Sequence, residues 1–169
     1  MNLLKNISRY LNQGLIWIAC CLLGAMIFLV CANIFLRSVW VPIKGTFELM
    51  GYFGAVMMAL ALGYTQMRKG HIAVDILVLG FSGRTRKILD SINCLICMTF
   101  FALVSWQIAK YATTLWRTGE ITETLRIIYY PFVYGVALGC AVLALVFLVD
   151  FLLNLFQEKE GFQEKEGAP

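Results

Sequence analysis

Four long stretches of this chain are almost free of charged side chains, and they constrain the fold more than any other feature. They cover residues 15–36, 47–66, 88–113 and 128–151. A helix needs about 20 consecutive, mostly apolar residues to cross the hydrocarbon core of a bilayer. Each stretch meets that length, so the sequence predicts an all-α integral membrane protein with four transmembrane helices.

Composition supports this fold class and narrows the classes of function. The chain is 60% hydrophobic and 14% charged, whereas soluble domains carry about 25% charged residues. The net charge of +4 does not indicate nucleic acid as a partner, because basic residues in such proteins more often set topology. The first stretch exceeds the ~7–15 apolar residues of a signal peptide, so we expect it to be a retained span.

The distribution of Lys and Arg predicts the orientation in the membrane. If both termini are cytoplasmic, two of these side chains precede the first span, five lie between the second and third, and two follow the fourth. The inner side then holds nine, and the outer side holds five. The positive-inside rule favours this arrangement, so both termini are predicted to be cytoplasmic.

The segment between the second and third spans is neither a span nor an ordinary loop. Its basic first part includes the single histidine, His71, and its second part, residues 72–81, is apolar. Ten residues are too short to cross a bilayer, so residues 72–81 are predicted to form a short interfacial helix. His71 and Asp75 are four residues apart and would share one face of that helix, where they could form a charge-assisted contact.

Small residues predict close packing of helices. They recur every four residues in the second stretch and form a G-x-x-x-G pair in the fourth: Gly51, Ala55, Ala59, Gly63, Gly135 and Gly139. Small side chains let two helix backbones approach closely within a membrane. We expect these positions to pack against helices of this chain or of another protein.

Polar residues mark the ends of the first two spans. Asn33 and Arg37 close the first span on one helical face. Thr46 is expected to cap the second helix, and Glu48 falls in its first turn, where a carboxylate meets the positive end of the helix dipole. Arg37 and Glu48 flank the outer connection and could pair with each other or face a partner.

The C-terminal end differs in character from the rest of the chain. It is charged, and the hexapeptide Phe-Gln-Glu-Lys-Glu-Gly occurs twice in tandem from residue 156. We expect residues 157–169 to be a disordered tail, which leaves residues 1–156 as a single four-helix membrane domain.

Few residues could carry chemistry. One histidine cannot supply the two axial ligands that a haem-binding bundle usually offers, and no Walker A phosphate loop occurs. Cys94 and Cys97 form a C-x-x-C, so a stand-alone thiol redox protein is the main alternative, although the outer connections hold no cysteine for such a shuttle. A small homodimeric exporter is a weaker alternative, because no span centre holds the ionisable group that proton coupling needs. We predict no catalytic, metal-binding or substrate-binding residues, and no enzymatic activity.

The order and spacing of the polar residues resemble the small membrane subunit (DctQ-like) of TRAP (tripartite ATP-independent periplasmic) transporters. The resemblance extends over all four spans. It rests on Asn33 and Arg37, on Glu48-Leu49, and on the run Gly-His-Ile-Ala-Val-Asp at residues 70–75, with Pro131 also in place. The chain departs from the pattern in having a single acid at Glu48, where many relatives have two, and in its duplicated tail.

The resemblance implies a scaffold role in the bacterial inner membrane. In that family the small subunit binds a large multi-span permease that moves an organic acid (carboxylate or sulfonate) with sodium by an elevator motion. A periplasmic substrate-binding protein delivers the substrate. We therefore expect no cofactor in this chain, with Na⁺ in the large subunit, and membrane lipids around the helices. The family-motif residues expected to brace this subunit or contact its partner are Asn33, Arg37, Glu48, His71 and Asp75.

Overall fold

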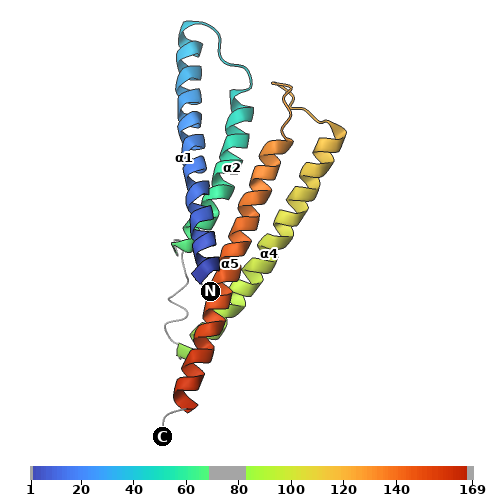
Figure 1. Ribbon diagram of the computed structural model, residues 1–169. Coiled ribbons are helices and arrows are strands. Elements are labelled where there is room, and N and C mark those ends of the chain that lie inside the picture. The colour runs from blue at the N-terminus through green and yellow to red at the C-terminus, as the bar shows by residue number, and fades with distance from the viewer. Residues whose placement is uncertain (1, 69–82, 167–169) are drawn as a thin grey trace.

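Each apolar stretch forms one long helix. The computed structural model of the protein describes residues 2–68 and 83–166. Its helices are α1 (Asn2–Val39), α2 (Thr46–Met67), α4 (Gly83–Thr118) and α5 (Tyr130–Glu166) (Figure 1). Each of these four contains a segment long and apolar enough to cross a membrane, which confirms the all-helical class with four spans. The predicted interfacial helix at residues 72–81 lies outside the described residues.

The helices are longer than the predicted spans. α1 begins at Asn2 instead of near residue 15, because its polar first turns are packed: Ser8 is 3% exposed and Asn12 is fully buried. α5 begins at Tyr130 and continues to Glu166, through much of the segment that was expected to be disordered. Glu, Gln and Lys are good helix formers, and extending an existing helix costs far less than starting one.

The four helices stand side by side in one row, in the order α1, α2, α5, α4 (Figure 1). α2 packs between α1 and α5, and α4 packs on the other side of α5. The row is thin, so only the inner helices are substantially covered. In the most apolar window of each helix, 50% of the residues of α5 are buried, against 11% of those of α1 and 6% of those of α4.

α2 and α5 approach each other backbone to backbone. A Cβ atom placed on Gly139 would lie 2.5 Å from the carbonyl carbon of Ala59. A Cβ atom on Gly135 would lie 3.2 Å from Cγ1 of Val56. The absence of side chains at these two glycines therefore sets how closely the central pair of helices can pack.

One face of α1 packs against this central pair. Its buried residues are Ser8, Asn12, Leu15 and Ala19, at the spacing of a single helical face. Asn12 Nδ2 donates to the Ser8 carbonyl oxygen at 2.9 Å, and its side chain lies directly against Gly63. Asn12 Oδ1 is buried without a hydrogen-bond partner among the described residues. A side chain on Gly63 would occupy the space that Asn12 fills.

Polar and aromatic contacts join α4 to α5. Ser105 Oγ donates to the Ala137 carbonyl oxygen at 2.8 Å. Thr113 Oγ1 lies 2.9 Å from the hydroxyl of Tyr134. Thr113 donates its proton to the Ala109 carbonyl oxygen. The Tyr134 hydroxyl is therefore the donor in its hydrogen bond with Thr113. Such bonds hold helices together within an apolar environment, where packing alone gives little preference for one partner.

Candidate functional site

Two of the predicted motif residues, Asn33 and Glu48, build the end of the molecule where the α1–α2 and α4–α5 connections, the two predicted to be outer, lie close together (Figure 1). Asn33 Oδ1 accepts a hydrogen bond from the backbone N–H of Ile43 at 2.9 Å. This ties the connection between α1 and α2 back to the last turns of α1. Thr46 does not cap α2 as expected, because its hydroxyl donates to the Ile43 carbonyl oxygen at 2.8 Å. Gly45 occupies the cap position in a left-handed conformation, with φ of 75°.

Glu48 links the two outer connections. Its Oε1 accepts from the backbone N–H of Thr124 at 2.8 Å, and its Oε2 accepts from that of Leu125 at 3.2 Å. Both partners lie in the connection between α4 and α5. The carboxylate therefore satisfies two backbone donors of that connection, and such charge-assisted bonds are the stronger kind. The suggested Arg37–Glu48 pair is not formed, because Glu48 is directed at this connection instead.

The connection between α4 and α5 is itself ordered by local hydrogen bonds. The Thr122 N–H donates to the Ile127 carbonyl oxygen at 3.0 Å, and the Arg126 N–H donates to the Thr122 carbonyl oxygen at 3.2 Å. Arg126 has a positive φ of 52°, which reverses the chain within this turn. The side chain of Leu125 fills the space beside Gly45, so a residue with a Cβ there would displace it. The left-handed φ and this close approach both favour glycine at position 45.

Tyr129 fixes the start of α5 beneath this connection. Its hydroxyl donates to Glu120 Oε2 at 2.8 Å, and its ring stacks on Tyr52 of α2 with 5.6 Å between centroids. The hydrogen bond to Glu120 raises the pKa of Tyr129 above its ordinary value of 10.0, and partial burial and the Glu120 charge add to the rise. The tyrosine is thus held as a neutral donor.

The small-residue stripe of α2 divides into two halves with different surroundings. Ala59 and Gly63 are buried against α5 and α1, whereas Gly51 and Ala55 are exposed. A four-residue repeat advances about 40° around a helix at each step, since a turn takes 3.6 residues. Over three steps the stripe rotates by about 120°, so its two ends cannot face the same neighbour. The outer half continues an exposed face that also carries Phe47 and Met58, which are 86% and 69% exposed.

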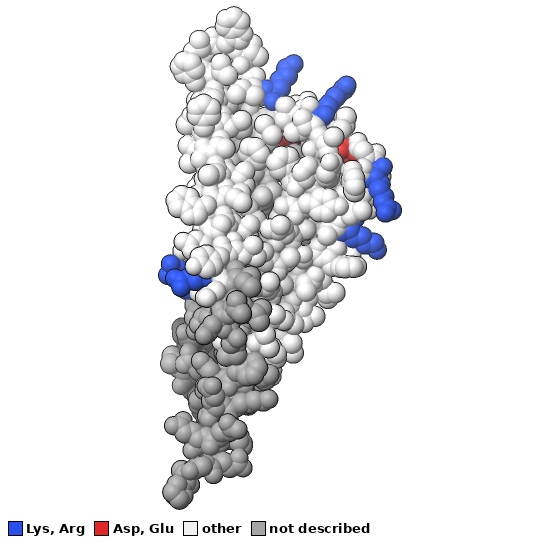
Figure 2. All heavy atoms as spheres, in the orientation of Figure 1, with Lys and Arg blue, Asp and Glu red and all other residues white. Residues whose placement is uncertain are grey.

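Exposed apolar surface is the main feature of α1 and α4, the helices at the two ends of the row. Figure 2 shows Lys and Arg gathered toward the upper right and at the lower left of the described surface, with uncharged atoms across the face between. Large exposed side chains on α1 include Trp17, Phe28 and Phe35, at 69%, 77% and 67% exposed. Lipid or protein must cover such a surface in a membrane. Arg37 is exposed at its outer end.

The thiol redox alternative depends on two cysteines, Cys94 and Cys97. Both lie on α4, and Cys97 Sγ is 3.7 Å from Asn93 Oδ1. Among the described residues, no group of three or more His, Cys, Asp or Glu side chains could hold a metal ion. These observations give no support to the thiol redox alternative. His71 and Asp75 lie outside the described residues.

The sequence did not predict the long-range hydrogen bonds of Glu48 or the burial of Asn12. The acceptor role of Glu48 depends on backbone donors 76 and 77 residues away, which no local pattern reveals. The burial of Asn12 did leave a signal, because Ser8, Asn12, Leu15 and Ala19 follow the spacing of one helical face. That signal was obscured by the polarity of its first two members.

Comparison with known proteins gives a match to a family model. No curated protein and no solved structure matches the chain. The family model described as "Tripartite ATP-independent periplasmic transporters, DctQ component" matches residues 26–157. That match takes in most of the chain, from the middle of α1 to beyond the apolar part of α5. The chain therefore belongs to the DctQ family, the small permease components of TRAP transporters.

Proposed function

We propose that this chain is the small scaffold subunit of a sodium-coupled TRAP transporter for an organic acid. It braces a large, elevator-type permease subunit, and a periplasmic substrate-binding protein supplies the substrate, a carboxylate or a sulfonate. Sodium and substrate bind to the large subunit. Membership of the DctQ family supports the transporter assignment, and the arrangement of the helices supports the bracing role.

One observation carries the bracing role: the four helices form an open row with uncovered faces. In the windows of α1 and α4 only 11% and 6% of the residues are buried, so most residues there keep exposed surface for lipid or for another protein. A proton-coupled transporter that worked alone would need an ionisable group near mid-membrane. A thin row of this kind instead suits a subunit that widens a larger partner.

The exposed face of α2 is the proposed contact with the permease. Phe47, Gly51, Ala55 and Met58 lie on it at spacings of four, four and three residues. Large side chains at its ends flank two small residues at its middle, where a partner helix can approach closely. Arg37, exposed at the same end of the molecule, is proposed to face the partner as well. His71 and Asp75 are proposed to brace this subunit or contact its partner.

The proposed location is the bacterial inner membrane, with both termini in the cytoplasm. The excess of Lys and Arg in the inner segments supports this orientation. The two connections that Asn33 and Glu48 organise then face the periplasm, on the side from which a substrate-binding protein arrives.

Co-purification tests this proposal. A tagged copy of the chain, expressed together with a large TRAP permease subunit from the same organism, should recover that permease in a fixed stoichiometry. A four-span TRAP small subunit from an unrelated system serves as the control bait. The proposal fails if the permease elutes equally with both baits, or if the chain purifies alone as an active transporter.

A further inference from the structure

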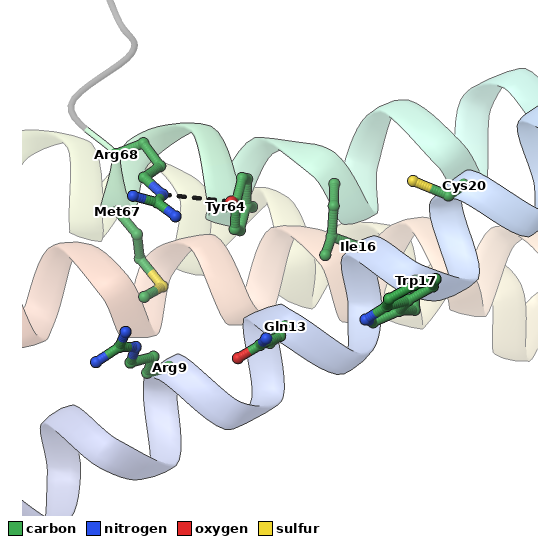
Figure 3. A pocket seen from close by; sticks show the side chains of 8 residues that line it. All are labelled: Arg9, Gln13, Ile16, Trp17, Cys20, Tyr64, Met67 and Arg68. Atoms are coloured by element: carbon green, nitrogen blue, oxygen red, sulfur yellow. Dashed lines mark hydrogen bonds between the residues drawn. The ribbon is translucent and has the colours of Figure 1, made fainter.

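A hollow of about 560 Å³ opens between α1 and α2 at the end opposite the outer connections (Figure 3). α1 contributes Arg9, Gln13 and Trp17 to its wall, and α2 contributes Tyr64 with Arg68 just beyond its end. The two helices run in opposite directions, so the start of α1 meets the end of α2. Arg9 and Arg68 therefore lie at the same level along the helix axes, as Figure 3 shows.

The hollow concentrates positive charge. Arg9 makes no hydrogen bond or ion pair with the residues that the structure describes, and no carboxylate lines the hollow. Arg68 Nε donates to the Tyr64 hydroxyl at 3.3 Å, and its guanidinium carbon lies 5.5 Å from the centroid of the tyrosine ring. This contact holds Arg68 in place, and no carboxylate of the described residues pairs with its charge. Two neighbouring guanidinium groups suit a phosphate, which they can bind with paired hydrogen bonds.

Polarity changes along the hollow in the direction of the helix axes. Arg9 and Arg68 lie at one end, and Ile16, Trp17 and Cys20 line the other (Figure 3). Arg9 lies at the edge of the α1 segment that could span a membrane, which begins at Ser8. Trp17 lies eight residues further along, about 12 Å deeper at 1.5 Å per residue. A phospholipid shows the same gradient across a leaflet, from phosphate to acyl chain, with aromatic side chains at the boundary.

We infer that this hollow binds one anionic phospholipid, with its headgroup phosphate between Arg9 and Arg68 and an acyl chain along Ile16 and Trp17. The site is independent of the transport function proposed above. It would join α1 to α2 at the end where the described residues provide no ion pair between the two helices. Each basic side chain near an anionic headgroup contributes on the order of 1 kcal/mol, so removing both charges should weaken binding by about 30-fold.

Trp17 allows binding to be measured directly on the full chain. Phenylalanine replaces the tryptophans at positions 40, 106 and 116, and Trp17 emission is then recorded in detergent with lipids brominated on their acyl chains. Brominated phosphatidylglycerol should quench Trp17 at a concentration at least tenfold lower than brominated phosphatidylcholine. Equal quenching by both lipids would overturn the inference, because the hollow would then be an apolar groove without anion recognition.

Charge variants test the two arginines. In the same background, R9Q/R68Q should remove the preference for phosphatidylglycerol, and R9K/R68K should retain much of it. The control K44Q/R117Q removes the same net charge from exposed positions at the other end and should leave the preference intact. An unchanged preference in R9Q/R68Q, or its loss in the control, would contradict the site.

A soluble phosphate compound is the alternative occupant of the charged end. Glycerol 3-phosphate carries the same phosphate chemistry without acyl chains. At millimolar concentration it should fail to displace brominated phosphatidylglycerol from the chain that retains both arginines. Full displacement would show that the hollow recognises a soluble phosphate, and it would overturn the assignment to a lipid.

Discussion

Glu48 on α2 accepts a hydrogen bond from the backbone N–H of Thr124, 76 residues further along the chain, at 2.8 Å. Its second oxygen accepts from the neighbouring N–H of Leu125. A single carboxylate in the first turn of α2 thereby fixes the connection between α4 and α5. The bond joins the two helical hairpins of the molecule at the end where both outer connections lie.

Replacing Glu48 should loosen that connection selectively. E48Q retains one carbonyl acceptor and should lose one of the two bonds, and E48A should lose both. Hydrogen exchange at the amides of Thr124 and Leu125 should therefore accelerate in E48Q and more strongly in E48A. Glu123, an exposed neighbour, provides the control E123Q, which should leave both amides protected. Equal exchange in all four proteins would mean that the carboxylate does not hold the connection.

Gly139 should tolerate no side chain. Its Cβ position lies 2.5 Å from the Ala59 carbonyl carbon, so G139A must push α2 and α5 apart, at a cost of about 1–3 kcal/mol. Thermal unfolding in detergent should show a lower midpoint for G139A. Gly51 is the matched control, because no heavy atom lies within 4 Å of its Cβ position. G51A should be neutral or stabilising by about 0.5–1 kcal/mol, the usual gain of alanine over glycine in a helix. A G139A protein as stable as G51A would contradict the close contact.

Asn12 and Gly63 should show strong energetic coupling. G63A places a Cβ against the buried Asn12 side chain and should destabilise the protein by about 1–3 kcal/mol. N12A removes the obstructing group, together with an oxygen that has no hydrogen-bond partner among the described residues. The double variant N12A/G63A should therefore be more stable than G63A alone, which a double-mutant cycle on unfolding free energies would measure. Simple additivity of the two changes would count against the contact.

Tyr129 should lose its phenolic proton at a higher pH than an ordinary tyrosine does. Its pKa is raised by the hydrogen bond to Glu120, by partial burial and by the Glu120 charge, so folding favours the neutral phenol. The resulting stabilisation is present below pH 10 and is lost as the pH rises through the higher folded-state value. Tyrosinate absorbance should show that Y129F removes amplitude from the most alkaline part of the titration. Y10F, which removes an exposed tyrosine at the other end, controls for the loss of one chromophore. Loss of amplitude near pH 10 in Y129F would contradict the raised pKa.

The exposed half of the small-residue stripe should matter for assembly and not for the fold of the subunit. Neither G51L nor A55L meets a neighbouring helix within the chain, since both positions are exposed. Both should leave thermal unfolding of the isolated chain nearly unchanged while reducing recovery of the permease several-fold. G24L on α1, another glycine with open space around it, is the control and should assemble normally. Full recovery of the permease by G51L and A55L would place this face against lipid.

The long-range features of the fold lay beyond what the sequence could predict. Hydropathy identified all four spans because crossing a bilayer imposes a length and a composition that are visible locally. The order of the helices in the row depends on close approaches such as that of Gly139 to Ala59. Small residues predict that two helices pack closely, but they do not identify which two helices do so. The split of the Gly51–Gly63 stripe is predictable in retrospect from the 3.6-residue turn.

At the candidate site, the sequence indicated which residues to consider but not which atoms they contact. Asn33 and Glu48 were identified from position, but their partners, Ile43 and the backbone of Thr124, became apparent only in three dimensions. Thr46 satisfied the usual preference for a helix cap, yet a left-handed Gly45 took that position. A cap is decided by the direction from which the chain enters, and the tight outer connection sets that direction here.

The scaffold role is tested most directly by reconstituted uptake. Proteoliposomes containing the large permease subunit that co-purifies with this chain are supplied with the purified substrate-binding protein and an inward sodium gradient. Uptake of the organic acid should be robust when this chain is included and should fall at least tenfold when it is omitted. Proteoliposomes that contain this chain without the permease should show no uptake. Full uptake by the permease alone, or uptake by this chain alone, would contradict the account.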